Sequence, residues 1–189
     1  MLDNFNLEKL VSPALGWYKK NKRDLPWRKD KNPYHIWVSE IMLQQTRVEA
    51  VKGYYERFLH RLPTILDLAS CPEDELLKLW EGLGYYNRVR NMQRAAKVMV
   101  ENYEGGFPKS YEEILSLPGI GSYTAGAISS IAFGLPHPAV DGNVLRILCR
   151  VAEDDSDIKK ESVKKAVAGL LSPIIPKDGS LFDSSICRF

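Results

Sequence analysis

The sequence has few cysteines, no long apolar run and no clear strand pattern. Its 3 cysteines are isolated, so they form neither a disulfide framework nor a set of metal ligands. No stretch of about 18 uninterrupted apolar residues occurs, which argues against a membrane span, and charged residues stand where a signal peptide needs an apolar segment. We therefore expect reduced thiols and a cytoplasmic protein.

The net charge of +2 is too small to identify a nucleic-acid partner, but the charges are unevenly distributed. Lysine and arginine gather in segments 19–31 and 88–97, whereas acidic residues gather in 153–161. One pole of the protein can then meet phosphate while the other stays in solvent. Charge runs are also common on ordinary solvated surfaces, so this pattern does not decide the function.

Apolar residues recur at helical intervals between turn signals, which predicts an all-α fold. We expect a six-helix module over residues 28–136 and a second helical domain built from residues 1–27 and 137–189. The predicted helices cover residues 7–21, 33–59, 65–70, 72–80, 86–103, 111–116, 122–133, 142–151 and 158–171.

The segment Leu117–Gly121 predicts a tight hairpin between two helices. Gly119 and Gly121 permit positive φ values and a close approach of the backbone. N–H groups of the hairpin, and of a helix that begins at Ser122, would then face one phosphate. An ordinary helix–turn–helix corner is the alternative for this segment taken alone.

Glu40 is a carboxyl group within an apolar helical pattern. On a helix over residues 33–59 it points in the same direction as Val51 and Phe58. Burial there favours the protonated carboxyl, which is the form that a general acid needs. A surface glutamate at the edge of the apolar stripe is the alternative.

Asp141 precedes a predicted helix and follows a proline-containing loop, so it is suited to be an N-cap. A capping carboxylate accepts backbone N–H bonds and stays charged. A negative charge beside a phosphate site is useful where a cation develops, as the oxocarbenium ion does during glycosidic-bond cleavage. A protonated Glu and an ionised Asp are the pair that this reaction uses.

Together these segments resemble the helix-hairpin-helix DNA glycosylases, and within them the adenine glycosylases of the MutY type. The likeness covers about residues 10–151, and its markers follow in order as Trp17–Tyr18, Arg23–Arg28, Val38–Thr46, Trp80–Tyr86, the hairpin and Val140–Asn143. The resemblance implies excision of adenine mispaired with 8-oxoguanine or guanine from duplex DNA, after extrusion of the nucleotide into a pocket.

The resemblance also implies roles for individual residues. Glu40 would protonate adenine N7 and Asp141 would stabilise the sugar cation, and Tyr123 and Asn143 would help to hold that pair. Gln and Tyr side chains can fill space in a base stack. The predicted DNA contacts are Gln45, Thr46, Leu83, Tyr85, Arg28, Arg88, Gly119, Gly121 and Ser122.

Two alternative functions remain open. Endonuclease III-like enzymes are similar throughout but carry a lysine at the position of Tyr123, which forms a Schiff base with the sugar and leads to strand cleavage. No lysine follows the hairpin here until Lys159, which favours a monofunctional glycosylase. The other alternative is an inactive helix-hairpin-helix module that only binds DNA.

The C-terminal segment departs from the family. A helix resembled here by residues 182–186 leads, in the family, into four cysteines that hold an iron–sulfur cluster. Here Cys187 falls within that helix and the chain ends at Phe189, so we expect a truncated second domain, no cluster, and poor coverage of Val163, Val167 and Leu170. The resemblance allows a monovalent cation at the hairpin backbone. We expect a monomer.

Overall fold

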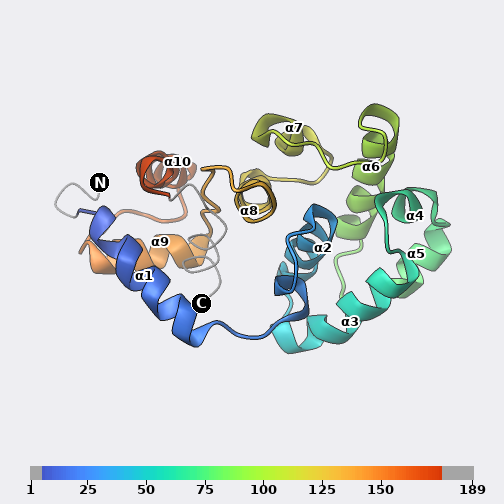
Figure 1. Cartoon of the computed structure of the whole chain (residues 1–189), viewed down its shortest axis with the longest axis horizontal. Coiled ribbons are helices and arrows are strands. Elements are labelled where there is room, and N and C mark those ends of the chain that lie inside the picture. Colours follow the sequence, from blue (N-terminus) through green and yellow to red (C-terminus); the bar gives the residue numbers. More distant parts are fainter. Residues whose placement is uncertain (1–5, 176–189) are drawn as a thin grey trace. The chain divides into compact units, whose positions relative to one another are not determined.

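The computed structural model describes residues 6–175, and no strand occurs in that part of the chain. The all-α prediction is confirmed. Two short 3-10 helices, η1 (Pro26–Arg28) and η2 (Ser172–Ile174), accompany the α-helices. The α-helices are α1 (Glu8–Asn21), α2 (Pro33–Leu43), α3 (Val48–Arg61), α4 (Ile65–Ser70), α5 (Glu73–Leu79), α6 (Asn87–Asn102), α7 (Tyr111–Ser116), α8 (Ser122–Phe133), α9 (Gly142–Val151) and α10 (Glu161–Leu171) (Figure 1).

The chain divides into two compact units. The central unit comprises residues 24–124, and the terminal unit combines the N-terminal segment up to Arg23 with the chain from Ala125 onward. The division falls within α8, so one helix contributes its first residues to the central unit and the remainder to the terminal unit. The predicted segment 182–186 and Cys187 lie outside the described residues.

Local side-chain caps explain why several helices begin where the sequence pattern predicts. Thr64 accepts from the backbone N–H of Asp67 at 3.2 Å, and the Asp67 carboxylate accepts from the backbone N–H of Thr64 at 3.0 Å. Ser110 and Glu113 form the same reciprocal box at the start of α7. Each box satisfies two N–H groups that the first turn of a helix leaves without partners.

The predicted continuous helix over residues 33–59 is wrong. The chain leaves helical geometry at Gln44 and adopts a left-handed conformation at Gln45, with φ of 60°, before α3 begins at Val48. No Gly or Pro marks this break, so the sequence pattern runs through it. The shared direction expected for Glu40, Val51 and Phe58 therefore fails, because Glu40 lies on α2 and the other two lie on α3.

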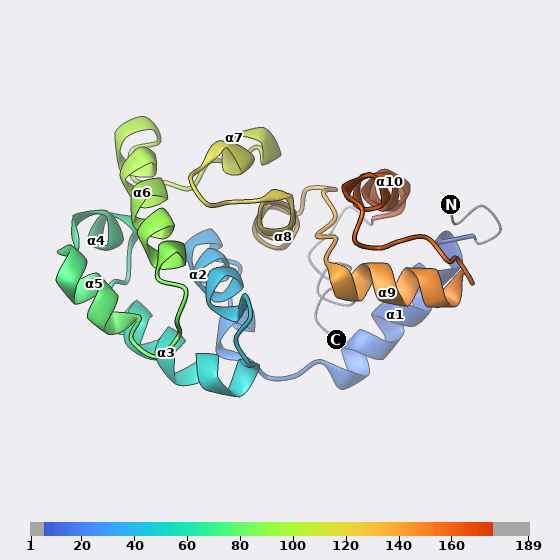
Figure 2. The ribbon, with the colours of Figure 1, turned by 180° about the vertical axis from the view of Figure 1, so that it is seen from behind.

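The core of the central unit forms around α2. Ile36, Trp37, Val38 and Met42 are all fully buried, and the other residues of this helix are buried or half-buried, so none of its faces is open to solvent. The Trp37 ring meets Phe107 edge to face at a centroid distance of 5.5 Å, a favoured aromatic geometry. Helix α4 packs against α6 (Figure 2).

The terminal unit contains one unusually close backbone approach. A Cβ atom placed on Gly126 of α8 would lie 2.6 Å from the carbonyl oxygen of Pro138, in the loop that leads to α9.

In α10, Val167 is fully buried and Leu170 is 41% exposed. Val163 is half-buried. The expectation of poor coverage is thus wrong for Val167 and right for Leu170. No helix in the described part of the chain is long and apolar enough to span a membrane.

We predict opposite effects on stability for alanine at two helical glycines of the terminal unit. Gly126→Ala forces the Pro138 backbone to move and should lower the free energy of unfolding by roughly 1–3 kcal/mol. Gly169→Ala places its methyl group in open space within α10 and should raise it by roughly 0.5–1 kcal/mol. Urea unfolding of both variants checks this, and equal effects of the two substitutions would contradict it.

Candidate active site

Glu40 lies near the C-terminal end of α2, a helix whose start is defined by local chemistry. The Asn32 side chain accepts from the backbone N–H of Tyr34 at 2.9 Å, and Pro33 occupies the first helical position. The Glu40 side chain is 3% exposed. The predicted burial of this carboxyl is therefore correct, but its cause is the enclosure of α2 on all sides and not an apolar stripe shared with α3.

The hairpin brings a hydroxyl group to this buried carboxyl. Leu117 ends α7, Gly119 adopts φ of 75°, and Ile120 donates its backbone N–H to the Leu117 carbonyl at 3.2 Å. Because α8 then begins at Ser122, its second residue is Tyr123. The Tyr123 hydroxyl donates to Glu40 Oε2 at 3.2 Å, which fixes the direction of a carboxyl group shielded from solvent.

The hairpin itself has the geometry that the glycine pattern predicts. A Cβ atom on Gly119 would lie 2.6 Å from Cβ of Asn91 on α6, in addition to the strain of a positive φ, so only glycine fits. Gly119, Gly121 and Ser122 are all exposed. The turn and the start of α8 are therefore accessible to an anion.

Asp141 is the N-cap of α9, as the sequence predicts. Its Oδ1 atom accepts from the backbone N–H groups of Asn143 and Val144, both at 2.9 Å. Its Oδ2 atom accepts from the Asn143 side-chain amide at 3.1 Å. Arg146 donates to the carbonyl oxygen of that same amide, so Asn143 is itself oriented. The half-buried Asp141 carboxylate is thus held in one position by three N–H donors.

The predicted DNA contacts fall into accessible and enclosed side chains. Gln45 is exposed and Tyr85 is 67% exposed, and both adopt positive φ values, of 60° and 47°. Thr46 is half-buried, with its hydroxyl 3.4 Å from the Gln44 carbonyl oxygen. Leu83 is buried and Arg28 is half-buried within η1, so neither projects freely from the surface.

Arg88, predicted as a DNA contact, instead directs its guanidinium at carbonyl groups of the protein's own backbone. Both terminal nitrogens donate to carbonyl groups, and Nη1 meets the Ile41 and Gln44 oxygens at 2.7 Å each. Nη2 reaches the Leu83 and Gly84 oxygens at 3.0 and 3.2 Å. Burial lowers the pKa of this guanidinium from its usual range. No sequence signal distinguishes this arginine from a phosphate ligand.

One small hollow brings several of these segments together within the central unit. It has a volume of about 170 Å³, and its lining includes Gln44, Arg88 and the hairpin residues Pro118 and Gly119. The turn after α2, the start of α6 and the hairpin are therefore neighbours. Of the residues predicted to contact DNA, Arg88 and Gly119 line this hollow.

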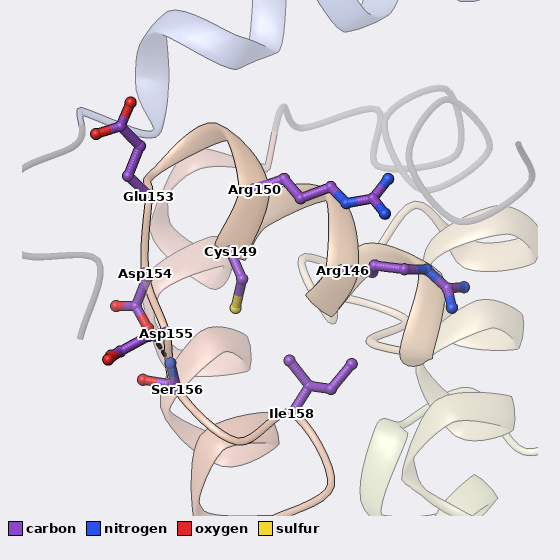
Figure 3. A pocket seen from close by; sticks show the side chains of 8 residues that line it. All are labelled: Arg146, Cys149, Arg150, Glu153, Asp154, Asp155, Ser156 and Ile158. Carbon is purple, nitrogen blue, oxygen red and sulfur yellow. Dashed lines mark hydrogen bonds between the residues drawn. The ribbon is translucent and has the colours of Figure 1, made fainter.

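A larger hollow, of about 460 Å³, lies in the terminal unit but contains none of the predicted site residues. Arg146 and Arg150 project from α9, and Asp154 and Asp155 follow in the next loop (Figure 3). Cys149 also lines it, and burial together with the Asp154 carboxylate raises the pKa of its thiol. Such a thiol is poorly reactive, as expected for a structural cysteine.

The residues present do not fit an iron–sulfur cluster. Four thiolates are needed, whereas the whole sequence has 3 cysteines. Cys71 lies in the central unit and Cys149 in the terminal unit, both buried and free. Among residues 6–175, no group of three His, Cys, Asp or Glu side chains is placed to hold a metal ion.

Several known proteins are similar to this chain over most of its length. A human adenine DNA glycosylase is 45% identical over 170 residues, which cover 85% of this chain and 31% of the human protein. An adenine DNA glycosylase of Buchnera aphidicola is 50% identical over 137 residues, covering 72% of this chain and 39% of that protein. The chain thus spans about a third of the length of these relatives.

Solved structures agree with the fold. A thermostable thymine-DNA glycosylase superposes with a TM-score of 0.85 at 30% identity, covering 96% of this chain and 85% of that one. Endonuclease III in a non-covalent complex with DNA gives a TM-score of 0.76 at 26% identity with the same coverage. The sequence of residues 38–173 matches the family model of the HhH-GPD superfamily of base excision DNA repair proteins. The predicted family is confirmed, and the chain belongs to the HhH-GPD superfamily of base excision DNA repair proteins.

Proposed function

We propose that this chain is a monofunctional adenine DNA glycosylase that acts on adenine opposite 8-oxoguanine or guanine in duplex DNA. The observation that carries the proposal is the hydrogen bond of 3.2 Å between Tyr123 and the buried carboxyl of Glu40. The resemblance to endonuclease III-like lyases implies that Tyr123 takes the position of their Schiff-base lysine, which favours a glycosylase without lyase activity. The sequence identities of 45% and 50% to the adenine DNA glycosylases of human and Buchnera aphidicola support adenine as the base.

The proposed chemistry divides between two carboxyl groups. Glu40, kept from water, donates a proton to adenine N7. The bond between N9 and C1′ then breaks, its electron pair leaves with adenine, and the sugar becomes an oxocarbenium ion. The Asp141 carboxylate stabilises that cation, and water adds to C1′ with loss of a proton. Tyr123 orients the acid and Asn143 orients the anion.

The proposed DNA contacts follow from exposure. The hairpin and the start of α8 present exposed backbone to a phosphate, while Gln45 and Tyr85 are accessible for insertion into the base stack. A monovalent cation at the hairpin backbone, the absence of a cluster, a cytoplasmic location and a monomeric state stay predictions.

A base-release assay tests the function directly. A duplex with adenine opposite 8-oxoguanine is incubated with excess protein, and strand breaks are measured with and without alkali. Breaks that require alkali are expected, because a glycosylase without lyase activity leaves an intact abasic strand. Breaks without alkali would indicate the endonuclease III-like alternative. Binding of the duplex without any base release would indicate the module that only binds DNA.

We predict that Glu40→Gln removes adenine release and leaves duplex affinity within a few-fold of the parent. General acid catalysis contributes roughly 10²–10⁴ in rate, and an amide has no proton to give to the leaving base. Single-turnover kinetics and fluorescence anisotropy measure the two quantities. Tyr123→Phe is the matched control, since it retains the acid and loses only the hydroxyl that orients it, so a smaller loss is expected. Near-parental release by Glu40→Gln would contradict the role.

Asp141 allows its two roles, cap and catalyst, to be separated. Asp141→Asn retains the cap, because Asn caps helices about as well as Asp, but it removes the negative charge. Excision should fall severely while the unfolding temperature stays near the parental value. Asp141→Ala should lose activity and also about 1 kcal/mol of stability, the usual value of a cap. Parallel losses of stability and activity in the Asn variant would show that Asp141 is only a cap.

A further inference from the structure

Arg88 connects two turns that are far apart in the sequence. One is the turn Gln44–Arg47 between α2 and α3, and the other is the turn Gly82–Tyr86 before α6. Nη1 donates to the end of α2 and to the first of these turns, and Nη2 donates to the second turn. A single guanidinium therefore bridges the two segments.

The first group of acceptors explains why a cation is needed there. The last carbonyls of a helix have no intrahelical partner, and they form the negative end of its dipole. Ile41 and Met42 belong to the last turn of α2, where water has little access because the helix is enclosed. Arg88 Nη1 lies 2.7 Å from the Ile41 oxygen, which also accepts from the Gln44 backbone N–H at 3.4 Å, and 3.4 Å from the Met42 oxygen. The guanidinium is therefore a charged donor to the last carbonyls of α2.

The second turn is held by Arg88 together with an aromatic side chain. The indole Nε1 of Trp80 donates to the Gly84 carbonyl at 3.0 Å, and Arg88 Nη2 donates to that carbonyl at 3.2 Å. The guanidinium carbon lies 5.3 Å from the Trp80 ring and 5.7 Å from the Tyr85 ring, within the range of cation–π attraction. Arg88 thus contacts both the backbone and the exposed ring of this turn.

In each turn, an exposed side chain projects from a residue whose backbone is left-handed. Gln45 has φ of 60° and Tyr85 has φ of 47°, conformations that are unfavourable for residues with a Cβ atom. Such conformations persist where the surrounding structure holds them, and they cluster at functional positions. Two of the carbonyl groups that Arg88 bonds belong to Gln44 and Gly84, the residues immediately before Gln45 and Tyr85.

We propose that Arg88 is a positioning residue that locks the Gln45 and Tyr85 turns to each other, so that the two side chains meet the DNA duplex at a set spacing. This inference rests on the proposed function for its consequence on DNA, but the lock itself is a property of the free protein. Arg88 acts through the two turns and not by contact with phosphate. Lysine cannot replace it, because one ammonium lacks the planar fork that reaches both sets of carbonyls.

Hydrogen exchange in the free protein tests the lock without DNA. In Arg88→Lys, amides of the segments 44–47 and 82–87 should exchange roughly tenfold faster or more, since both turns lose their shared donor. Amides of α4 and α7 should exchange at the parental rate. Arg61→Ala is the control, because it removes one positive charge and an exposed ion pair with Glu75 from the same unit. Unchanged exchange in both turns of Arg88→Lys would overturn the proposal.

A mutant cycle tests the consequence for DNA. The ratio of the dissociation constants for matched and mispaired duplexes is measured for the parent, for Arg88→Lys, for the double variant Gln45→Ala with Tyr85→Ala, and for all three substitutions combined. Arg88→Lys should lower this ratio roughly tenfold in the parent. In the double alanine variant, which already lacks the Gln45 and Tyr85 side chains, it should lower the ratio less than about twofold. Affinity for the matched duplex should change little, because Lys retains the charge.

The outcomes separate this proposal from the proposed function. An equal loss of discrimination in both backgrounds would show that Arg88 reads DNA directly, and no loss in either would show that the lock has no role in recognition. Both results overturn the proposal. A parent protein that neither releases adenine nor prefers the mispair would contradict the proposed function. The hydrogen-exchange result then decides by itself whether Arg88 holds the two turns together.

Discussion

The enclosure of α2 is the constraint on which the rest of the central unit depends. A helix with no solvated face must satisfy its last carbonyls within the protein, since buried polar groups without partners are costly. Arg88 meets that need, and because its fork is wide it also binds the turn before α6. The same enclosure keeps water from Glu40. Packing of one helix therefore supports both the candidate acid and the candidate DNA-contacting turns.

The two candidate catalytic groups are held by different physical means. Glu40 depends on tertiary burial and on a hydroxyl from Tyr123, more than eighty residues later in the chain. Asp141 depends on its own helix, whose first N–H groups and Asn143 amide fix the carboxylate. A general acid gains from exclusion of water, whereas an anion that faces a developing cation needs donors that hold it. The local environments match these opposite needs.

Arg88 and the break after α2 show where sequence patterns fail. Gln45 adopts a left-handed conformation without glycine, and the apolar periodicity continues from Trp37 through Phe58 as if the helix were unbroken. The break is held by Arg88, which donates to the Gln44 carbonyl and lies more than forty residues away in sequence. A pattern that depends on neighbours within a few turns contains no information about such a partner.

The sequence by itself determined the helical class, the hairpin, the cap at Asp141 and the ends of α4, α7 and α9. These features depend on side chains within a few residues of one another. Only the tertiary structure decided that α2 is buried on every side, that Tyr123 meets Glu40, and that Arg88 binds two distant turns. These features require segments far apart in the chain to be packed together, and the energies that hold them are those of burial and of long-range hydrogen bonds.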